Sequence, residues 1–145
     1  MNKWDKNFLE LAKTVSTFSK DPSTKVGAVI VDGDNRVISI GYNGFPKGIK
    51  DDHRLDNREL KYEMVVHAEA NALLFANAPT KGCTIYTWPF QPCSRCASLI
   101  IQSGIRRVVS VESKDQKWSS HFQLAHDMMR EARIEIKTYQ GVVTP

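Results

Sequence analysis

The chain has 145 residues, of which 41% are hydrophobic and 25% charged, and it carries a formal net charge of +4. These proportions are typical of one globular domain with a real core, and no apolar run is long enough to cross a membrane. The positive surplus is modest and scattered, which favours a solvated surface over a nucleic-acid-binding face. We therefore expect a single domain over residues 1–145 that binds neither membranes nor nucleic acid.

The N-terminal part predicts a helix followed by a β-hairpin. Apolar residues at helical spacing over residues 4–18 predict the helix, and Asp21-Pro22 ends the pattern. The opening residues lack the apolar core of a signal peptide, so we expect a cytoplasmic protein. Two apolar segments, 25–31 and 36–42, flank a turn rich in Asp, Gly and Asn, and they predict an antiparallel pair.

A long polar loop is predicted next. Glycines and a proline between residues 41 and 48 exclude regular structure and let the backbone approach a ligand, although a simple turn has the same composition. The loop continues to about Asn57, with a short helical turn at 59–63, and its length favours a function. A second helix is predicted over residues 65–78, with Pro79 beyond its end.

The C-terminal half alternates strands and helices. The predicted strands are 83–88, 107–111 and 134–137, and the predicted helices cover 94–103 and the region of 122–129. This alternation predicts right-handed crossovers and parallel pairing of these three strands. We expect an α/β fold: a three-layer α/β/α sandwich on a five-stranded mixed sheet, with a ligand site at one edge of the strands.

Two short motifs together predict a catalytic metal ion. The first is His67-Ala68-Glu69, and the second is Pro92-Cys93-Ser94-Arg95-Cys96. One imidazole and two thiols supply three ligands to a tetrahedral zinc ion and leave its fourth position for water. Glu69 is close enough to act on that water as a proton shuttle without binding the metal. Both motifs fall at predicted helix starts, where the pKa of a thiol is lowered.

Each piece alone has a plainer interpretation. A lone CxxC pair can be a redox centre or half of a structural zinc site, and a lone His on a helix is usually a core residue. A structural zinc ion would need a fourth ligand, and none of the other candidates lies in a partner motif. These candidates are Cys83, His53, His121 and His126. The last two are more than one helical turn apart, so we expect them on the surface.

In combination, the motifs resemble the cytidine deaminase superfamily. Four further segments make the chain similar to deoxycytidylate (dCMP) deaminases, over about residues 4–139. They are Ser19-Lys20-Asp21-Pro22, Val26-Gly27-Ala28, Gly41-Tyr42-Asn43-Gly44 and residues 99–105. The resemblance implies a cytidine deaminase-like fold and the hydrolysis of dCMP to dUMP and ammonia, which supplies a precursor for thymidylate synthesis.

The resemblance also assigns roles to residues. It implies that His67, Cys93 and Cys96 bind one Zn²⁺, that Glu69 moves protons, and that Asn43 donates or accepts a hydrogen bond with the nucleotide. Members are typically homohexamers activated by dCTP with Mg²⁺ and inhibited by dTTP. Their effector lies near the loop that matches Asn43, Gly44 and the residues after them.

Other residues are weaker candidates for contacts with the substrate or effector nucleotide. The backbone at Ala68, in the first turn of a predicted helix, is placed to hold a substrate carbonyl. A free nucleotide also needs cationic or amide partners for its 5′-phosphate, and the candidates are Lys25, Lys47, Arg54 and Ser23. Tyr42 and Gly44 are further candidates for contact with the substrate or effector nucleotide.

Three alternatives to dCMP deamination stay open. The segment 88–91 is one residue longer than the family pattern, and this leaves the specificity for base and sugar open. The first alternative is therefore the deamination of a free nucleoside. Deamination of adenosine in tRNA is the second, although the moderate charge argues against it. The third is a non-catalytic, zinc-stabilised nucleotide sensor, against which the presence of Glu69 argues. The chain lacks a convincing set of Cys and His for a second zinc ion.

Overall fold

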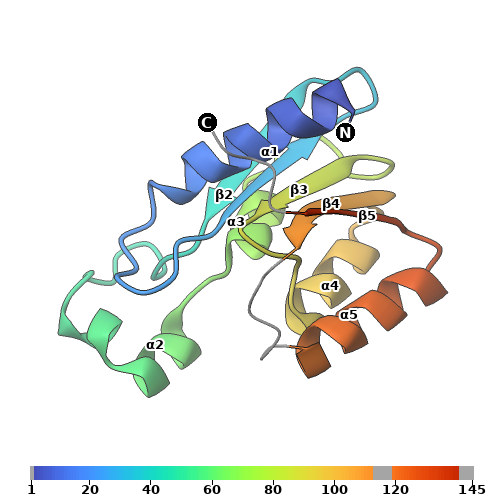
Figure 1. Cartoon of the computed structure of the whole chain (residues 1–145). Coiled ribbons are helices and arrows are strands. Elements are labelled where there is room, and N and C mark those ends of the chain that lie inside the picture. Colours follow the sequence, from blue (N-terminus) through green and yellow to red (C-terminus); the bar gives the residue numbers. More distant parts are fainter. Residues whose placement is uncertain (1, 113–118, 141–145) are drawn as a thin grey trace.

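Five strands form one mixed sheet in the computed structural model, which describes residues 2–112 and 119–140 (Figure 1). The strands are β1 (Gly27–Val31), β2 (Val37–Tyr42), β3 (Thr84–Trp88), β4 (Arg107–Glu112) and β5 (Glu135–Gln140), in the spatial order β2-β1-β3-β4-β5. β1 pairs antiparallel with both β2 and β3, whereas β3, β4 and β5 are parallel. The predicted hairpin and the predicted parallel pairing are both confirmed.

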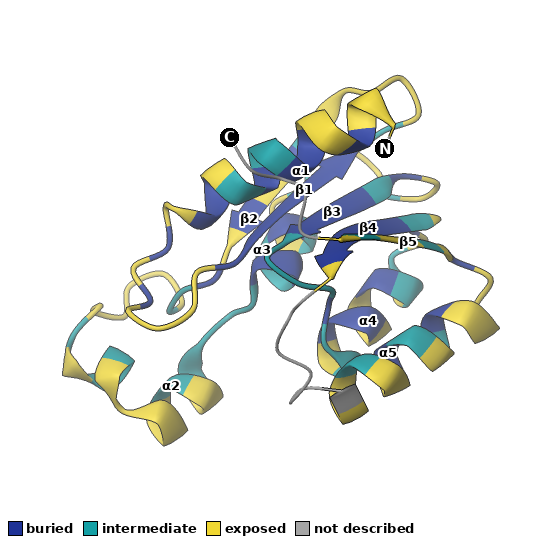
Figure 2. Cartoon of the chain, viewed as in Figure 1, coloured by how far each residue is buried: buried dark blue, intermediate teal, exposed yellow. Residues whose placement is uncertain are grey.

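Helices cover both faces of this sheet, which confirms the predicted three-layer sandwich. They are α1 (Lys3–Ser16), α2 (Arg58–Met64), α3 (Ala68–Leu74), α4 (Ser94–Gln102) and α5 (Ser119–Glu131), with a short 3-10 helix η1 (His53–Asp56). α1 lies on one face, and α3, α4 and α5 lie on the other (Figure 1). α2 projects from the sandwich and buries none of its residues (Figure 2). No helix among the described residues has the length and apolar character needed to span a membrane.

Each face of the sheet has its own apolar core. Under α1, the side chains of Leu9 and Val15 pack against Val29 and Val109, and all four are at most 1% exposed. On the other face, Ala, Ile and Met side chains of α3, α4 and α5 pack against the opposite side of the same strands. Burial of each large aliphatic side chain contributes about 1.5–3 kcal/mol. The sheet is therefore a rigid support for the loops at its edge.

β2 fixes the position of α3 through unusually close contact. A Cβ atom at Gly41 would collide with the backbone of Ala68 and Ala72, so only glycine allows the helix to approach the strand this closely. Ser39 Oγ adds a hydrogen bond of 2.6 Å to the carbonyl oxygen of Ala72. The start of α3 is thus held against the sheet by backbone packing.

Both boundaries of the second predicted helix, over residues 65–78, are wrong. Val66 pairs with Gly44 in an isolated antiparallel bridge, so residues 65–67 are extended and the helix begins only at Ala68. His67 is therefore the residue before α3 rather than part of its first turn, while Glu69 does lie in that turn. The helix ends at Leu74, and the residues after it, including Phe75, are largely exposed. The isolated bridge, a long-range pairing, overrides the local periodicity.

A buried charged cluster joins α1 to three strands, and we call it the Asp5 cluster. The Asp5 carboxylate is fully buried and accepts hydrogen bonds from Arg107 (2.7 and 2.8 Å), Tyr86 (2.9 Å) and Tyr139 (2.7 Å). Burial, the largest influence, raises the pKa of Asp5, but the hydrogen bonds outweigh it and the pKa lies below its usual value. The cluster is a fully paired structural element.

Candidate active site

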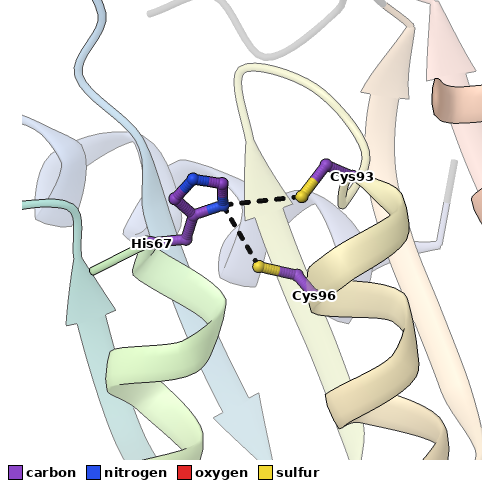
Figure 3. A group of neighbouring side chains, drawn as sticks. All are labelled: His67, Cys93 and Cys96. Carbon is purple, nitrogen blue, oxygen red and sulfur yellow. Dashed lines mark hydrogen bonds between the residues drawn. The ribbon is translucent and has the colours of Figure 1, made fainter. Parts of the chain in front are cut away.

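The three predicted metal ligands meet where two helices begin side by side (Figure 3). His67 directly precedes α3, Cys93 directly precedes α4, and Cys96 lies in the first turn of α4. His67 Nδ1 is 3.5 Å from Cys93 Sγ and 3.3 Å from Cys96 Sγ. The three ligand atoms all lie within 4.8 Å of one another. The structure thus brings together residues separated by up to 29 positions in the chain.

This arrangement fits a tetrahedral zinc ion. With Zn–S bonds of about 2.3 Å and a Zn–N bond of about 2.0 Å, tetrahedral geometry separates nitrogen and sulfur by about 3.5 Å. The distances observed here are close to that value. In the described part of the chain, no further His, Cys, Asp or Glu joins the group, and Cys83, His53, His121 and His126 all lie outside it. Three ligands leave one position of the metal for water.

One of the two sulfur atoms, that of Cys93, already favours the negatively charged form. A hydrogen bond with Cys96 is the main cause that lowers the pKa of Cys93 to about 3, and His67 lowers it further against the effect of burial. The same hydrogen bond with Cys93 is the main cause that raises the pKa of Cys96. The hydrogen bond to Cys93 also raises the pKa of His67. Bound zinc would replace these shared protons as the positive charge between the ligands.

Glu69 lies beside this group and is only 4% exposed. Burial is the main cause that raises its pKa to about 7, and contact with its own backbone N–H opposes the rise. Among the described residues, no other side chain donates a hydrogen bond to the Glu69 carboxylate. A carboxyl group with a pKa near neutrality can both accept and release a proton at physiological pH, as general acid–base catalysis requires.

The loop around Asn43 lies directly beside the metal-ligand group. Gly44 and Val66 exchange two backbone hydrogen bonds of 2.8 and 3.1 Å, one residue before His67. The buried Asn43 side chain accepts from Val26 N (2.9 Å) and donates to Thr24 O (2.9 Å). One amide hydrogen and one oxygen lone pair stay available to a ligand. A nucleotide contact at Asn43 therefore stays a prediction.

The weaker candidates are each engaged in other contacts, none of which involves the metal-ligand group. Lys25 Nζ donates to Ser19 O (2.7 Å), Lys47 Nζ lies 4.6 Å from the ring centroid of Phe75, and Arg54 pairs with Asp52 (2.8 Å). Ser23 bonds to Asp21 and Lys61. The Tyr42 ring meets Phe18 edge-on, and Ala68 is buried. Their nucleotide contacts stay predictions.

The segment between β3 and Pro92 is joined to α5. Thr87 Oγ1 donates to Phe90 O (2.8 Å), and Gln91 Nε2 donates to Phe122 O (3.0 Å). The rings of Phe90 and Phe122 are 5.8 Å apart between centroids. These contacts hold the residues directly before Pro92 and Cys93 against a neighbouring helix. The expected extra residue of this segment stays a prediction.

Sequence reasoning missed one pair of side chains beside the site. Arg95, between the two cysteine ligands, places its guanidinium carbon 5.2 Å from the ring centroid of Tyr62 in α2. Its positive charge acts on His67, where it opposes the rise in pKa. The position of Arg95 inside the CxxC motif was the available signal, but its partner lies 33 positions earlier and could not be inferred from spacing.

Comparison with known proteins agrees with this geometry. Residues 2–112 match the family model described as the cytidine and deoxycytidylate deaminase zinc-binding region. An uncharacterized deaminase of the luxG 3′ region of Aliivibrio fischeri is 43% identical over 139 residues, covering 94% of this chain and 93% of the relative. A probable deoxycytidylate deaminase of Caenorhabditis elegans is 41% identical over 143 residues, covering 95% of this chain and 69% of the relative.

A solved structure shares the fold. The dCMP deaminase of the cyanophage S-TIM5 superposes in its apo form with a TM-score of 0.74, at 23% identity, covering 95% of this chain and 99% of that one. The same phage enzyme has been crystallised with dCMP and dUMP, and that structure superposes with a TM-score of 0.72. From the family match and the relatives, the chain belongs to the cytidine and deoxycytidylate deaminase zinc-binding family.

Proposed function

We propose that this chain is a zinc-dependent enzyme that hydrolyses dCMP to dUMP and ammonia. The observation that carries the proposal is the meeting of three metal ligands with the buried Glu69, whose pKa is raised to about 7. The choice of dCMP is supported by the worm relative, which is named a probable deoxycytidylate deaminase, and by the phage enzyme crystallised with dCMP and dUMP.

In this mechanism His67, through Nδ1, and the sulfur atoms of Cys93 and Cys96 would hold the metal. A zinc ion bound there would supply a water molecule whose pKa falls to about 7. Glu69 accepts a proton from the attacking water and passes it to N3 of cytosine as the oxygen bonds to C4. Glu69 then takes the proton of the new hydroxyl group and gives it to the amino group. The C4–N bond breaks, ammonia leaves, and a C4 carbonyl remains.

The direct test measures ammonia release from dCMP, deoxycytidine and tRNA in separate assays, on protein whose zinc content has been measured. We expect one zinc ion per chain and the highest kcat/KM for dCMP. A higher kcat/KM for deoxycytidine or tRNA would show that this compound, and not dCMP, is the substrate. Nucleotide binding without turnover would indicate a sensor.

We further infer control by nucleotides: activation by dCTP with Mg²⁺, inhibition by dTTP, and assembly into homohexamers in the cytoplasm as part of thymidylate supply. The support is the resemblance of residues 41–44 to the effector loop and the bridge from Gly44 to Val66, which connects that loop to the residue before His67. Rate measurements with each effector, and light scattering for the subunit number, test this inference. Rates unaffected by either effector would contradict it.

A further inference from the structure

Arg95 carries a positive charge beside the site without an acidic partner. It is exposed in the first turn of α4, between Cys93 and Cys96. Within residues 2–112 and 119–140, its guanidinium group makes no hydrogen bond or ion pair, and its ring contact is with Tyr62. No carboxylate of the described residues neutralises it.

The other cationic side chains considered for phosphate binding differ from Arg95 in this respect. Arg54 is paired with Asp52 at 2.8 Å. Lys25 donates to a backbone carbonyl. Lys47 shares with Arg95 the position over an aromatic ring, but it follows the Asn43 loop, whereas Arg95 lies between two metal ligands. Arg95 is therefore the candidate placed most directly at the reaction centre.

Tyr62 and Arg95 connect the two halves of the metal site. Tyr62 belongs to α2, the helix that leads through the extended residues 65–67 to His67, and Arg95 belongs to the helix that carries the sulfur ligands. Stacking on an aromatic ring restricts the arginine side chain, so less conformational entropy is lost when it binds a ligand. The planar guanidinium group matches a phosphate with two parallel hydrogen bonds.

We propose that Arg95, held in position by Tyr62, binds the 5′-phosphate of the nucleotide and so distinguishes a nucleotide from a nucleoside. This inference rests on the proposed function, because it concerns the phosphate of the same substrate. It assigns that recognition to a residue inside the CxxC motif, in place of Lys25, Lys47 and Arg54.

The test compares a phosphorylated with an unphosphorylated substrate in the zinc-loaded full chain. Arg95→Gln removes the charge with little change in size, and we expect kcat/KM for dCMP to fall by about 10- to 100-fold, mainly through KM. The kcat/KM for deoxycytidine should not change. Arg95→Lys should recover part of the loss, because it restores the charge but not the paired hydrogen bonds.

Two further variants control for indirect effects. Arg106→Gln removes an exposed arginine beyond the opposite end of α4 and should leave both substrates unaffected. Tyr62→Ala removes the ring under Arg95 and should lower kcat/KM for dCMP alone, by several-fold. Equal losses for both substrates in Arg95→Gln, or no loss for dCMP, would overturn the proposal.

Equilibrium binding separates this inference from the proposed function. Calorimetric titration with dUMP and with deoxyuridine needs no turnover. We expect Arg95→Gln to weaken dUMP binding by about 10- to 100-fold and to leave deoxyuridine binding unchanged. Absence of dCMP turnover in the wild-type chain would refute the proposed function, whereas unchanged dUMP affinity in the variant would refute the phosphate contact.

Discussion

Two carboxyl groups are buried on opposite faces of the same sheet, and their pKa values move in opposite directions. Asp5, under α1, has a lowered pKa, and Glu69, at the start of α3, has a pKa raised to about 7. Burial raises the pKa of both. Asp5 accepts four hydrogen bonds from Arg107, Tyr86 and Tyr139, whereas no other side chain of residues 2–112 and 119–140 donates one to Glu69. The partners, and not the depth of burial, separate the lowered pKa of Asp5 from the raised pKa of Glu69.

The same carboxyl-to-amide exchange should therefore have different consequences at the two sites. Glu69→Gln should lower kcat by about 10²- to 10⁴-fold, because the amide cannot move protons. Zinc content should stay the same, since Glu69 is not among the three ligands, and the melting temperature should not fall, because no hydrogen bond to another side chain is lost. Steady-state rates, metal analysis and thermal unfolding measure the three quantities. A wild-type kcat in this variant would contradict the assignment of Glu69 as the proton shuttle.

Asp5→Asn should instead act on stability. The exchange removes the buried charge partner of the mostly buried Arg107 guanidinium and leaves it only the exposed Glu135, and we expect the free energy of unfolding to fall by roughly 3 kcal/mol. Urea unfolding followed by circular dichroism measures this change. As a control, Asp34→Asn removes a carboxylate from an exposed pair with Arg36 and should have no measurable effect. Equal stability of the two variants would contradict the structural role of the Asp5 cluster.

Gly41→Ala tests how the sheet positions the reactive side. An added methyl group meets the backbone of Ala68 and Ala72, so α3 must shift away from β2, at a cost of about 1–3 kcal/mol. Because His67 and Glu69 move with α3, zinc affinity and kcat should decrease together. Gly33→Ala is the matched control, since its added carbon has no neighbour within 4 Å. An unchanged zinc affinity in Gly41→Ala would show that the helix start tolerates the shift.

The pH dependence of stability gives the smallest predicted effect. The folded pKa of Asp5 lies below its unfolded value of about 3.9. The stabilisation is therefore complete above that pH and is lost as the pH falls towards the folded pKa. The stability difference between the wild type and Asp5→Asn should be constant from pH 7 to 5 and shrink by pH 3. A difference that persists at low pH would mean that Asp5 is not charged in the folded chain.

Sequence reasoning predicted most of the elements and the residues of the candidate metal site, because both depend on local patterns. Apolar periodicity located the helices and strands, and the HxE and PCxxC motifs identified the candidate ligands, which the structure brings together. Contacts between distant segments could not be predicted in this way. Asp5 meets Tyr86, Arg107 and Tyr139 across 81, 102 and 134 positions. The bridge between Gly44 and Val66, which ends the helix before His67, is likewise a tertiary contact.

The spacing of the ligands along the chain has a consequence beyond catalysis. His67 is 26 positions from Cys93 and 29 from Cys96. An ion bound to all three residues closes a loop of that size, as a disulfide would. It therefore lowers the conformational entropy of the unfolded chain. A metal that serves turnover would thus also act as a cross-link between α3 and α4. Removal of the metal with a chelator should then lower the melting temperature of the protein as well as abolish its activity.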